Sequence, residues 1–181
     1  MLEDMLRNDL LQEAYRRGSE YLLRWSACAP TTFAAIMDTL GYADDPVAQE
    51  IWKSTIGLTG GTGNLTVGTC GAVASAAAAI SLSFGYNKED VEDLKKMMTV
   101  NAAVANIGQQ VKEVFGGIRC EEIQFNNWGK AFELTNREAL GEFMDMASNE
   151  RGKPRCQDVT AAIARMAVEK IMELNPQFVK R

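Results

Sequence analysis

Histidine is missing from this 181-residue sequence, and its absence excludes more chemistry than any other feature of the composition. Ser-His-Asp and Cys-His catalysis, His-ligated haem, Rieske-type ligation and His-containing zinc sites all require an imidazole. No CxxCH motif is present, so covalent c-type haem is excluded as well. Any bound metal would therefore be held mainly by sulfur or oxygen.

The sequence also lacks a long apolar run and an excess of positive charge. No stretch approaches the roughly 20 apolar residues that span a bilayer, and the charged, amphipathic N-terminus has no secretory hydrophobic region. The net charge of -5 argues against nucleic-acid binding, which needs a basic face. We therefore expect a cytoplasmic protein with no membrane insertion and no nucleic-acid partner. In the cytoplasm, cysteines bind metal or carry out redox chemistry more often than they form disulfides.

Apolar residues recur at helical spacing along most of the chain. The pattern predicts an all-α protein, a single domain over residues 1–181 that forms a helical bundle of about seven helices. The expected helices span residues 2–25, 31–41, 47–58, 71–84, 88–116, 136–147 and 156–174, with a short and less regular one after Cys120. Asp45 and Asn87 are suited to cap the third and fifth of these helices. The segment GNLTVGT is the one weak strand candidate.

A glycine-rich loop, GGTGNLTVGTCG, precedes the fourth expected helix. It is not a P-loop, because no Gly-Lys-Ser/Thr follows, and it is a poor dinucleotide fingerprint, because no strand precedes it. Its glycines are better suited to positive φ angles and close packing. The helix after it consists almost entirely of small residues from Ala72 to Ile80, which predicts a central position in the bundle.

Four single cysteines are the strongest functional signal in the sequence. Isolated cysteines are by default small buried core residues, but Cys28, Cys70, Cys120 and Cys156 each fall at or just before an expected helix start. Unpaired N–H groups and a partial positive charge at a helix N-terminus lower a thiol pKa. Arginine also precedes two of them, at positions 119 and 155. If the four starts converge, the thiolates would form a ligand set for an iron–sulfur cluster or two reactive dithiol pairs.

This arrangement resembles the C-GCAxxG-C-C family, whose members are assigned a redox role mainly because of four cysteines. Cys28 in SACAPTTFAAI resembles the first cysteine of the family, and Cys70 in GGTGNLTVGTCGAVAS the second. Cys120 in FGGIRCEEI resembles the third, and Cys156 in KPRCQDVTAAI the fourth. The resemblance covers about residues 15–168 and implies a small helical redox protein. A similar domain is found in split-Soret-type cytochromes, where the cysteines suggest an iron–sulfur site.

The GCAxxG segment itself is degenerate in this chain. Aligned on Cys70 it reads TCGAVA, so Thr69 replaces the first glycine, Gly71 the alanine and Ala74 the last glycine. Every replacement is small, which preserves close packing of the helix. The resemblance therefore rests on the order of the cysteines and on flanks such as FGGIRC.

Three functions follow as hypotheses. In the first, all four cysteines ligate one iron–sulfur cluster for electron transfer to a redox partner protein, making the chain an electron carrier rather than a stand-alone catalyst. The residues expected around such a cluster are Arg119, Arg155, Thr69 and Gly71. In the second, pairs such as Cys70 with Cys120 cycle between dithiol and disulfide without metal. In the third, the cysteines hold a structural zinc ion in a helical interaction module. The leucines of the first helix would support a homodimer in any of the three.

Overall fold

The computed structural model describes residues 2–149 and 155–180, and in these ranges the chain is all-α. It contains eight α-helices and three short 3-10 helices. The helices are α1 (Leu2–Trp25), α2 (Cys28–Thr39), α3 (Pro46–Ser54), α4 (Gly71–Ser83), α5 (Leu94–Phe115), α6 (Cys120–Trp128), α7 (Arg137–Asn149) and α8 (Cys156–Leu174), and the 3-10 helices are η1 (Ile56–Leu58), η2 (Lys88–Asp90) and η3 (Pro176–Phe178). The predicted fold class is confirmed. The eighth helix is α6, the one expected only as a short element.

Several helix boundaries differ from those expected, among them the end of α3, which lies at Ser54 and not at residue 58. The helix predicted over residues 88–116 is interrupted: Asn87 caps the short helix η2, and α5 begins only at Leu94. The reason is a competing cap, because the Asp93 side chain accepts the Lys96 N–H at 2.9 Å and starts a new helix there. Helix α2 begins at Cys28, earlier than expected, which places Pro30 in its first turn, where proline is tolerated.

Helices α2, α4 and α8 pack against one another at the centre of the bundle. The small-residue helix α4 contacts α2, α5 and α8, which confirms its predicted central position. Helix α1 lies across α2 and α8. Its approach to α8 depends on Gly18, since a Cβ at that position would lie 2.8 Å from the Ala161 Cα. A glycine that looks like a weak point in the helix is therefore a contact point between helices.

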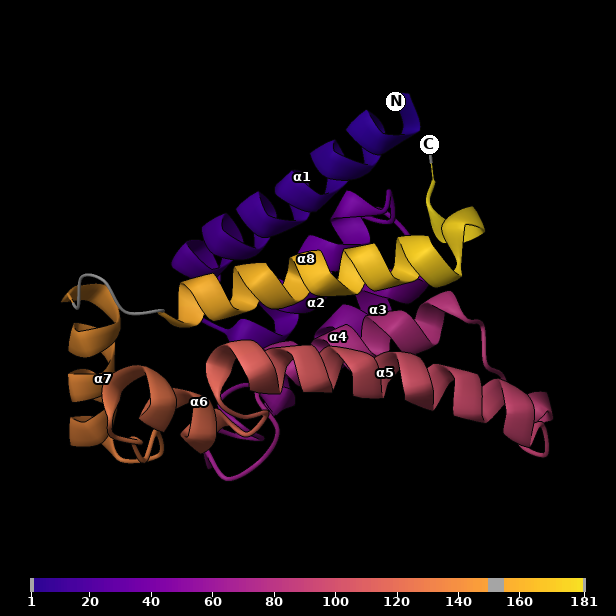
Figure 1. The fold of residues 1–181 in the computed structure, drawn as a ribbon. Coiled ribbons are helices and arrows are strands. Elements are labelled where there is room, and N and C mark those ends of the chain that lie inside the picture. The colour runs from indigo at the N-terminus through magenta and orange to yellow at the C-terminus, as the bar shows by residue number, and fades with distance from the viewer. Residues whose placement is uncertain (1, 150–154, 181) are drawn as a thin grey trace.

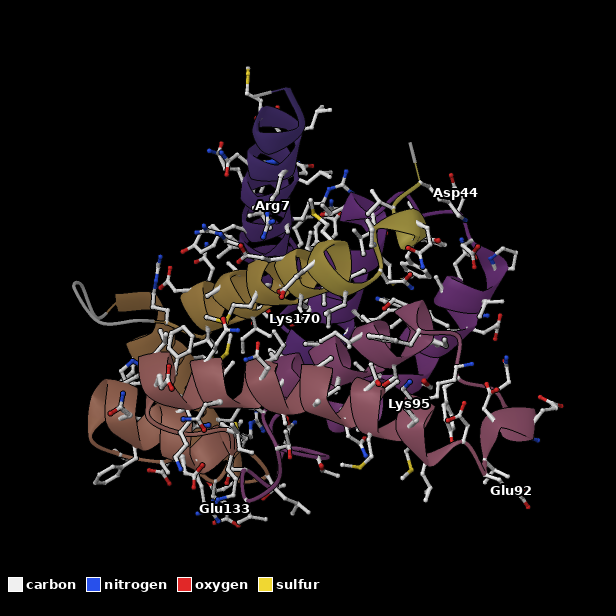
Figure 2. All side chains as sticks on the ribbon, turned by 45° about the vertical axis from the view of Figure 1, so that its right-hand side comes forward. Arg7, Asp44, Glu92, Lys95, Glu133 and Lys170 are labelled. Carbon is white, nitrogen blue, oxygen red and sulfur yellow. The ribbon has the colours of Figure 1, made fainter. Side chains whose placement is uncertain are left out.

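The bundle has two distinct ends (Figure 1). Both chain termini lie at one end, and α6 and α7 lie at the other, beside the start of α8. A second, smaller core occupies that far end, where Trp128, Phe132 and Leu134 are buried and Phe143 and Cys156 pack against them. Charged side chains such as Lys95 and Glu133 spread over the outside of the molecule (Figure 2). Among the helices of the described residues, none is both long and apolar enough to cross a membrane.

Candidate functional site

All four cysteines stand where helices begin. Cys28, Cys120 and Cys156 are the first residues of α2, α6 and α8, and Cys70 is the N-cap of α4. All four thiols are free. The placement predicted from the sequence is therefore confirmed for every cysteine.

Backbone pairing brings the start of α4 beside the start of α6. The Cys70 N–H donates to the Ile118 carbonyl at 2.8 Å, and the Cys120 N–H donates to the Gly68 carbonyl at 3.0 Å. Between them, Thr69 and Arg119 form an isolated antiparallel bridge. The segment GNLTVGT thus contributes a single bridge instead of a strand, and this bridge fixes Cys70 next to Cys120.

The glycine-rich loop before Cys70 has an unusual backbone. Five consecutive residues, Gly60 to Asn64, have φ angles between +58° and +71°. This left-handed range is accessible to glycine at little cost but strains Thr62, which is β-branched. Gly61 is also required for space, because a Cβ there would lie 2.8 Å from the Cys120 Cβ. The glycines therefore have the role predicted for them, positive φ and close packing.

The loop and the start of α4 surround the sulfur of Cys28. The pKa of Cys28 falls from its ordinary value of 9.0 to about 7, first because its thiolate interacts directly with the Cys70 thiol. Backbone N–H groups of Gly60, Gly71 and Ala29 lower it further, against the opposing effect of burial. Cys28 is half-buried, whereas Cys70 is only 7% exposed.

Gly71 leaves the space that the Cys28 sulfur occupies. A Cβ on residue 71 would lie 2.7 Å from the Cys28 Sγ and 2.9 Å from the Leu58 carbonyl oxygen. The replacement of the motif's alanine by glycine in this chain therefore has a structural reason: it lets the first turn of α4 pack directly onto the sulfur of Cys28.

The other three cysteines depart from the expectation that a helix start lowers a thiol pKa. Burial raises the pKa of Cys120 to about 11, although the Gln124 amide donates to its sulfur. The pKa of Cys156 is raised by burial, and that of Cys70 by its interaction with Cys28 and then by burial. Only for Cys28 do N–H groups from two other segments, the glycine-rich loop and the start of α4, lower the pKa. One helix N-terminus alone does not offset the loss of water.

The two arginines beside cysteines have carboxylate partners. Arg119 lies 2.7 Å from Glu121 and 3.0 Å from Glu122, and Arg155 lies 3.5 Å from Asp158. Glu122 also accepts the Arg119 backbone N–H at 3.0 Å and so caps α6. The positive charges predicted to face the thiols are therefore shared with neighbouring carboxylates.

Sequence reasoning missed Gln124, which connects Cys120 to the smaller core. This fully buried side chain donates from Nε2 to the Cys120 Sγ at 3.2 Å and accepts the Phe132 N–H at 2.8 Å. The available signal was its spacing, since residues i and i+4 share one face of a helix. Gly60 was missed as well, because no pattern in the sequence indicates which N–H of a loop points at a sulfur.

The four sulfurs lie near one another without forming a metal site. The pKa of Cys70 is raised by charge on Cys28, Cys120 and Cys156, so all four share one region. Within residues 2–149 and 155–180, however, no three cysteine, aspartate or glutamate side chains gather closely enough to hold a metal ion. Four thiols are suitable donors for an iron–sulfur cluster or for zinc.

An all-α bundle with four free thiols at neighbouring helix starts defines a small helical protein with a cysteine-based site. The family model "Putative redox-active protein (C_GCAxxG_C_C)" matches residues 26–170, a span that includes all four cysteines, and the chain belongs to this family. Neither the curated proteins nor the solved structures contain a match to the chain.

Proposed function

We propose that this chain is a thiol–disulfide redox protein in which Cys28 and Cys70 form the reactive couple. The observation that carries the proposal is the direct interaction of the two thiols. The N–H groups of Gly60, Gly71 and Ala29 also hydrogen-bond to the Cys28 sulfur. The pair differs from Cys70 with Cys120, the pair expected from the sequence. Packing of Gly71 against the Cys28 sulfur favours the new pairing.

The two cysteines have complementary roles in this proposal. Cys28 is half-buried and has a pKa of about 7, so about half of it is thiolate at neutral pH and can attack a partner. Cys70 is buried and its pKa is raised, so it stays protonated until a mixed disulfide forms beside it. Thiol–disulfide exchange is efficient with this division into an attacking and a resolving thiol.

The chemistry is a two-step exchange with a disulfide on a redox partner protein. The Cys28 thiolate attacks one sulfur of the partner disulfide, forms a mixed disulfide and releases one partner thiolate. Cys70 then loses its proton, which the released thiolate accepts, and attacks the Cys28 sulfur. The second partner thiolate leaves, so the partner is reduced by two electrons and a Cys28–Cys70 disulfide remains.

Peptide mapping after reaction with a small disulfide reagent tests this proposal. A Cys28–Cys70 disulfide should form, with two electrons per chain, and dithiothreitol should reverse it. Cys28→Ser should abolish the reaction, whereas Cys156→Ser, which removes a cysteine outside the pair, should leave it intact. A disulfide that joins any other two cysteines would overturn the assignment of the pair.

An iron–sulfur cluster held by Cys28, Cys70, Cys120 and Cys156 is a second candidate. It is favoured by the presence of four thiols, each at a helix start, in one region of the fold. The sulfurs would have to move closer together to hold it. Anaerobically prepared protein should then be brown and contain iron and labile sulfide, and colourless, iron-free protein after reconstitution would eliminate the cluster. Stoichiometric zinc without electron uptake would instead indicate the structural zinc site.

A further inference from the structure

A cavity of about 190 Å³ that opens to solvent lies between the end of α1, α2 and α3. Four aromatic side chains line it, together with one carboxylate: Trp25, Phe33, Tyr42, Trp52 and Asp38. No cysteine lines it, so the cavity is distinct from the four-cysteine site. Its volume exceeds the roughly 150 Å³ that holds a benzene molecule in an engineered protein cavity.

The aromatic walls are fixed in position. The Trp52 indole N–H donates to the Pro30 carbonyl at 3.0 Å. Trp25 packs edge-on against Trp52, with ring centroids 6.0 Å apart. Both indoles remain partly exposed at the cavity, at 38% and 39%. Because these partly exposed tryptophans are already held by a hydrogen bond and a ring contact, their side chains lose little further conformational entropy when a ligand packs against them.

Within the described residues, one carboxylate oxygen of Asp38 has hydrogen-bond and ion-pair partners and the other has none. Its Oδ2 accepts the Tyr21 hydroxyl at 3.0 Å and lies 3.6 Å from Arg17. In the described residues no hydrogen bond or ion pair involves Oδ1, and an ionised carboxylate accepts on both oxygens. Burial raises the pKa of Asp38, as expected of a charge that is incompletely solvated.

Carboxylates neutralise the positive side chains near the cavity, so a cationic ligand would not be repelled from it. Arg17 also bonds to Glu13 at 2.6 Å, so two carboxylates share its positive charge. Asp44 adds a negative field at Asp38. A second cation, Lys180, lies over the Tyr42 ring, 3.7 Å from its centroid, and bonds to Asp45 at 3.1 Å.

We propose that this cavity binds a small organic ammonium ion with an aromatic or compact apolar body. The ammonium N–H donates to the free Oδ1 of Asp38, and the body packs against Trp25 and Trp52. The indole faces add cation–π attraction. This ligand site goes beyond the redox function and does not depend on it.

Binding of benzylamine, measured at pH 7 by tryptophan fluorescence or NMR shifts, tests the proposal. Benzylamine should bind at least 10-fold more tightly than benzyl alcohol, which has the same ring and no charge. Asp38→Asn should weaken benzylamine binding about 10-fold and leave benzyl alcohol unchanged. Glu92→Gln, at an exposed carboxylate away from the cavity (Figure 2), serves as the matched control and should bind like the wild type.

Two outcomes would overturn the proposal. One is equal affinity of the unaltered protein for benzylamine and benzyl alcohol, a comparison that needs no variant and so remains decisive if Asp38→Asn does not fold. The other is benzylamine binding that Asp38→Asn and Glu92→Gln weaken equally, which would indicate general attraction to an acidic surface.

Discussion

The four-cysteine site consists of two pairs, Cys28 with Cys70 and Cys120 with Cys156. Both pairs lie at helix starts, but their thiols differ in pKa. Cys28 and Cys70 belong to helices of the central core and lie beneath the glycine-rich loop. Cys120 and Cys156 stand beside the smaller core, where Gln124 bonds to one sulfur and the aromatic cluster packs against the other. Each cysteine starts a helix, yet only Cys28 has a lowered pKa.

The difference shows that a helix start is not sufficient to make a thiol reactive. Burial removes water from all four sulfurs, and a single helix N-terminus does not replace it. At Cys28 the missing water is replaced by N–H groups from two further segments and by a second thiol. The Cys70 thiol, together with the N–H groups of the glycine-rich loop and the start of α4, therefore makes Cys28 the nucleophile, because a place at a helix start is common to all four cysteines.

The largest expected effect separates stability from reactivity. Phe132→Ala removes a buried ring from the smaller core and should lower the free energy of unfolding by about 3 kcal/mol, measured by denaturant titration. The pKa of Cys28 should stay near 7, because none of the groups that lower it belongs to that core. A shift of the Cys28 pKa in this variant would show that the two pairs are coupled.

The next effect is the contrast in reactivity between the pairs. At pH 7 Cys28 should react with a small disulfide reagent about 100-fold faster than Cys120, because its larger thiolate fraction outweighs its lower nucleophilicity. The Cys28 rate should rise with pH and level off above about 7, and the Cys120 rate should still be rising near 11. Time-resolved peptide mapping measures both rates in one sample, and faster modification of Cys120 would contradict the ordering.

Two glycines of the loop distinguish backbone strain from crowding. Gly61 and Gly63 both have positive φ, but only at Gly61 would a Cβ meet the Cys120 Cβ, at 2.8 Å. Each alanine substitution should cost about 1–2 kcal/mol for the left-handed backbone, and Gly61→Ala should cost about 1–3 kcal/mol more for overpacking. Thermal unfolding of the two variants gives the comparison. Equal losses would mean that the loop does not press on Cys120.

The smallest expected effect concerns Gly71. Gly71→Ala should displace the Cys28 Sγ, weaken its contacts with N–H groups and with Cys70, and raise the Cys28 pKa toward 9. The rate of Cys28 at pH 7 should then fall by about 10-fold, because a thiolate fraction near one half decreases as the pKa rises. Gly57→Ala, where a Cβ would meet no atom within 4 Å, is the control and should leave the rate unchanged.

Much of the fold follows from local signals in the sequence. Helical periodicity indicated the helices, and Asp45 caps α3 as expected by accepting the N–H groups of Val47 and Ala48. The interruption before α5 escaped prediction because Asn87 and Asp93 are both good caps, and periodicity continues across them. A pattern of apolar residues does not show which of two competing caps starts the helix.

Only the features of the site that depend on helix boundaries could be predicted from the sequence. The four cysteines and their helix starts were indicated by sequence, because helix boundaries are local. The pairing of Cys28 with Cys70, and the N–H of Gly60 at the Cys28 sulfur, depend on how a loop folds back over a distant helix. Such contacts join segments far apart in the chain, and single-residue patterns carry no information about them.

The lowered pKa of Cys28 makes proton release a direct measure of the proposed chemistry. Since the chain has no histidine, no imidazole buffers near pH 7 to obscure the signal. Below pH 7 both thiols are protonated, and oxidation by a disulfide reagent whose released thiols stay ionised releases two protons. Above pH 7 Cys28 has already lost its proton and only the one on Cys70 is released. The number of protons released per disulfide formed should therefore fall from two to one across neutrality, and a pH-stat can count them.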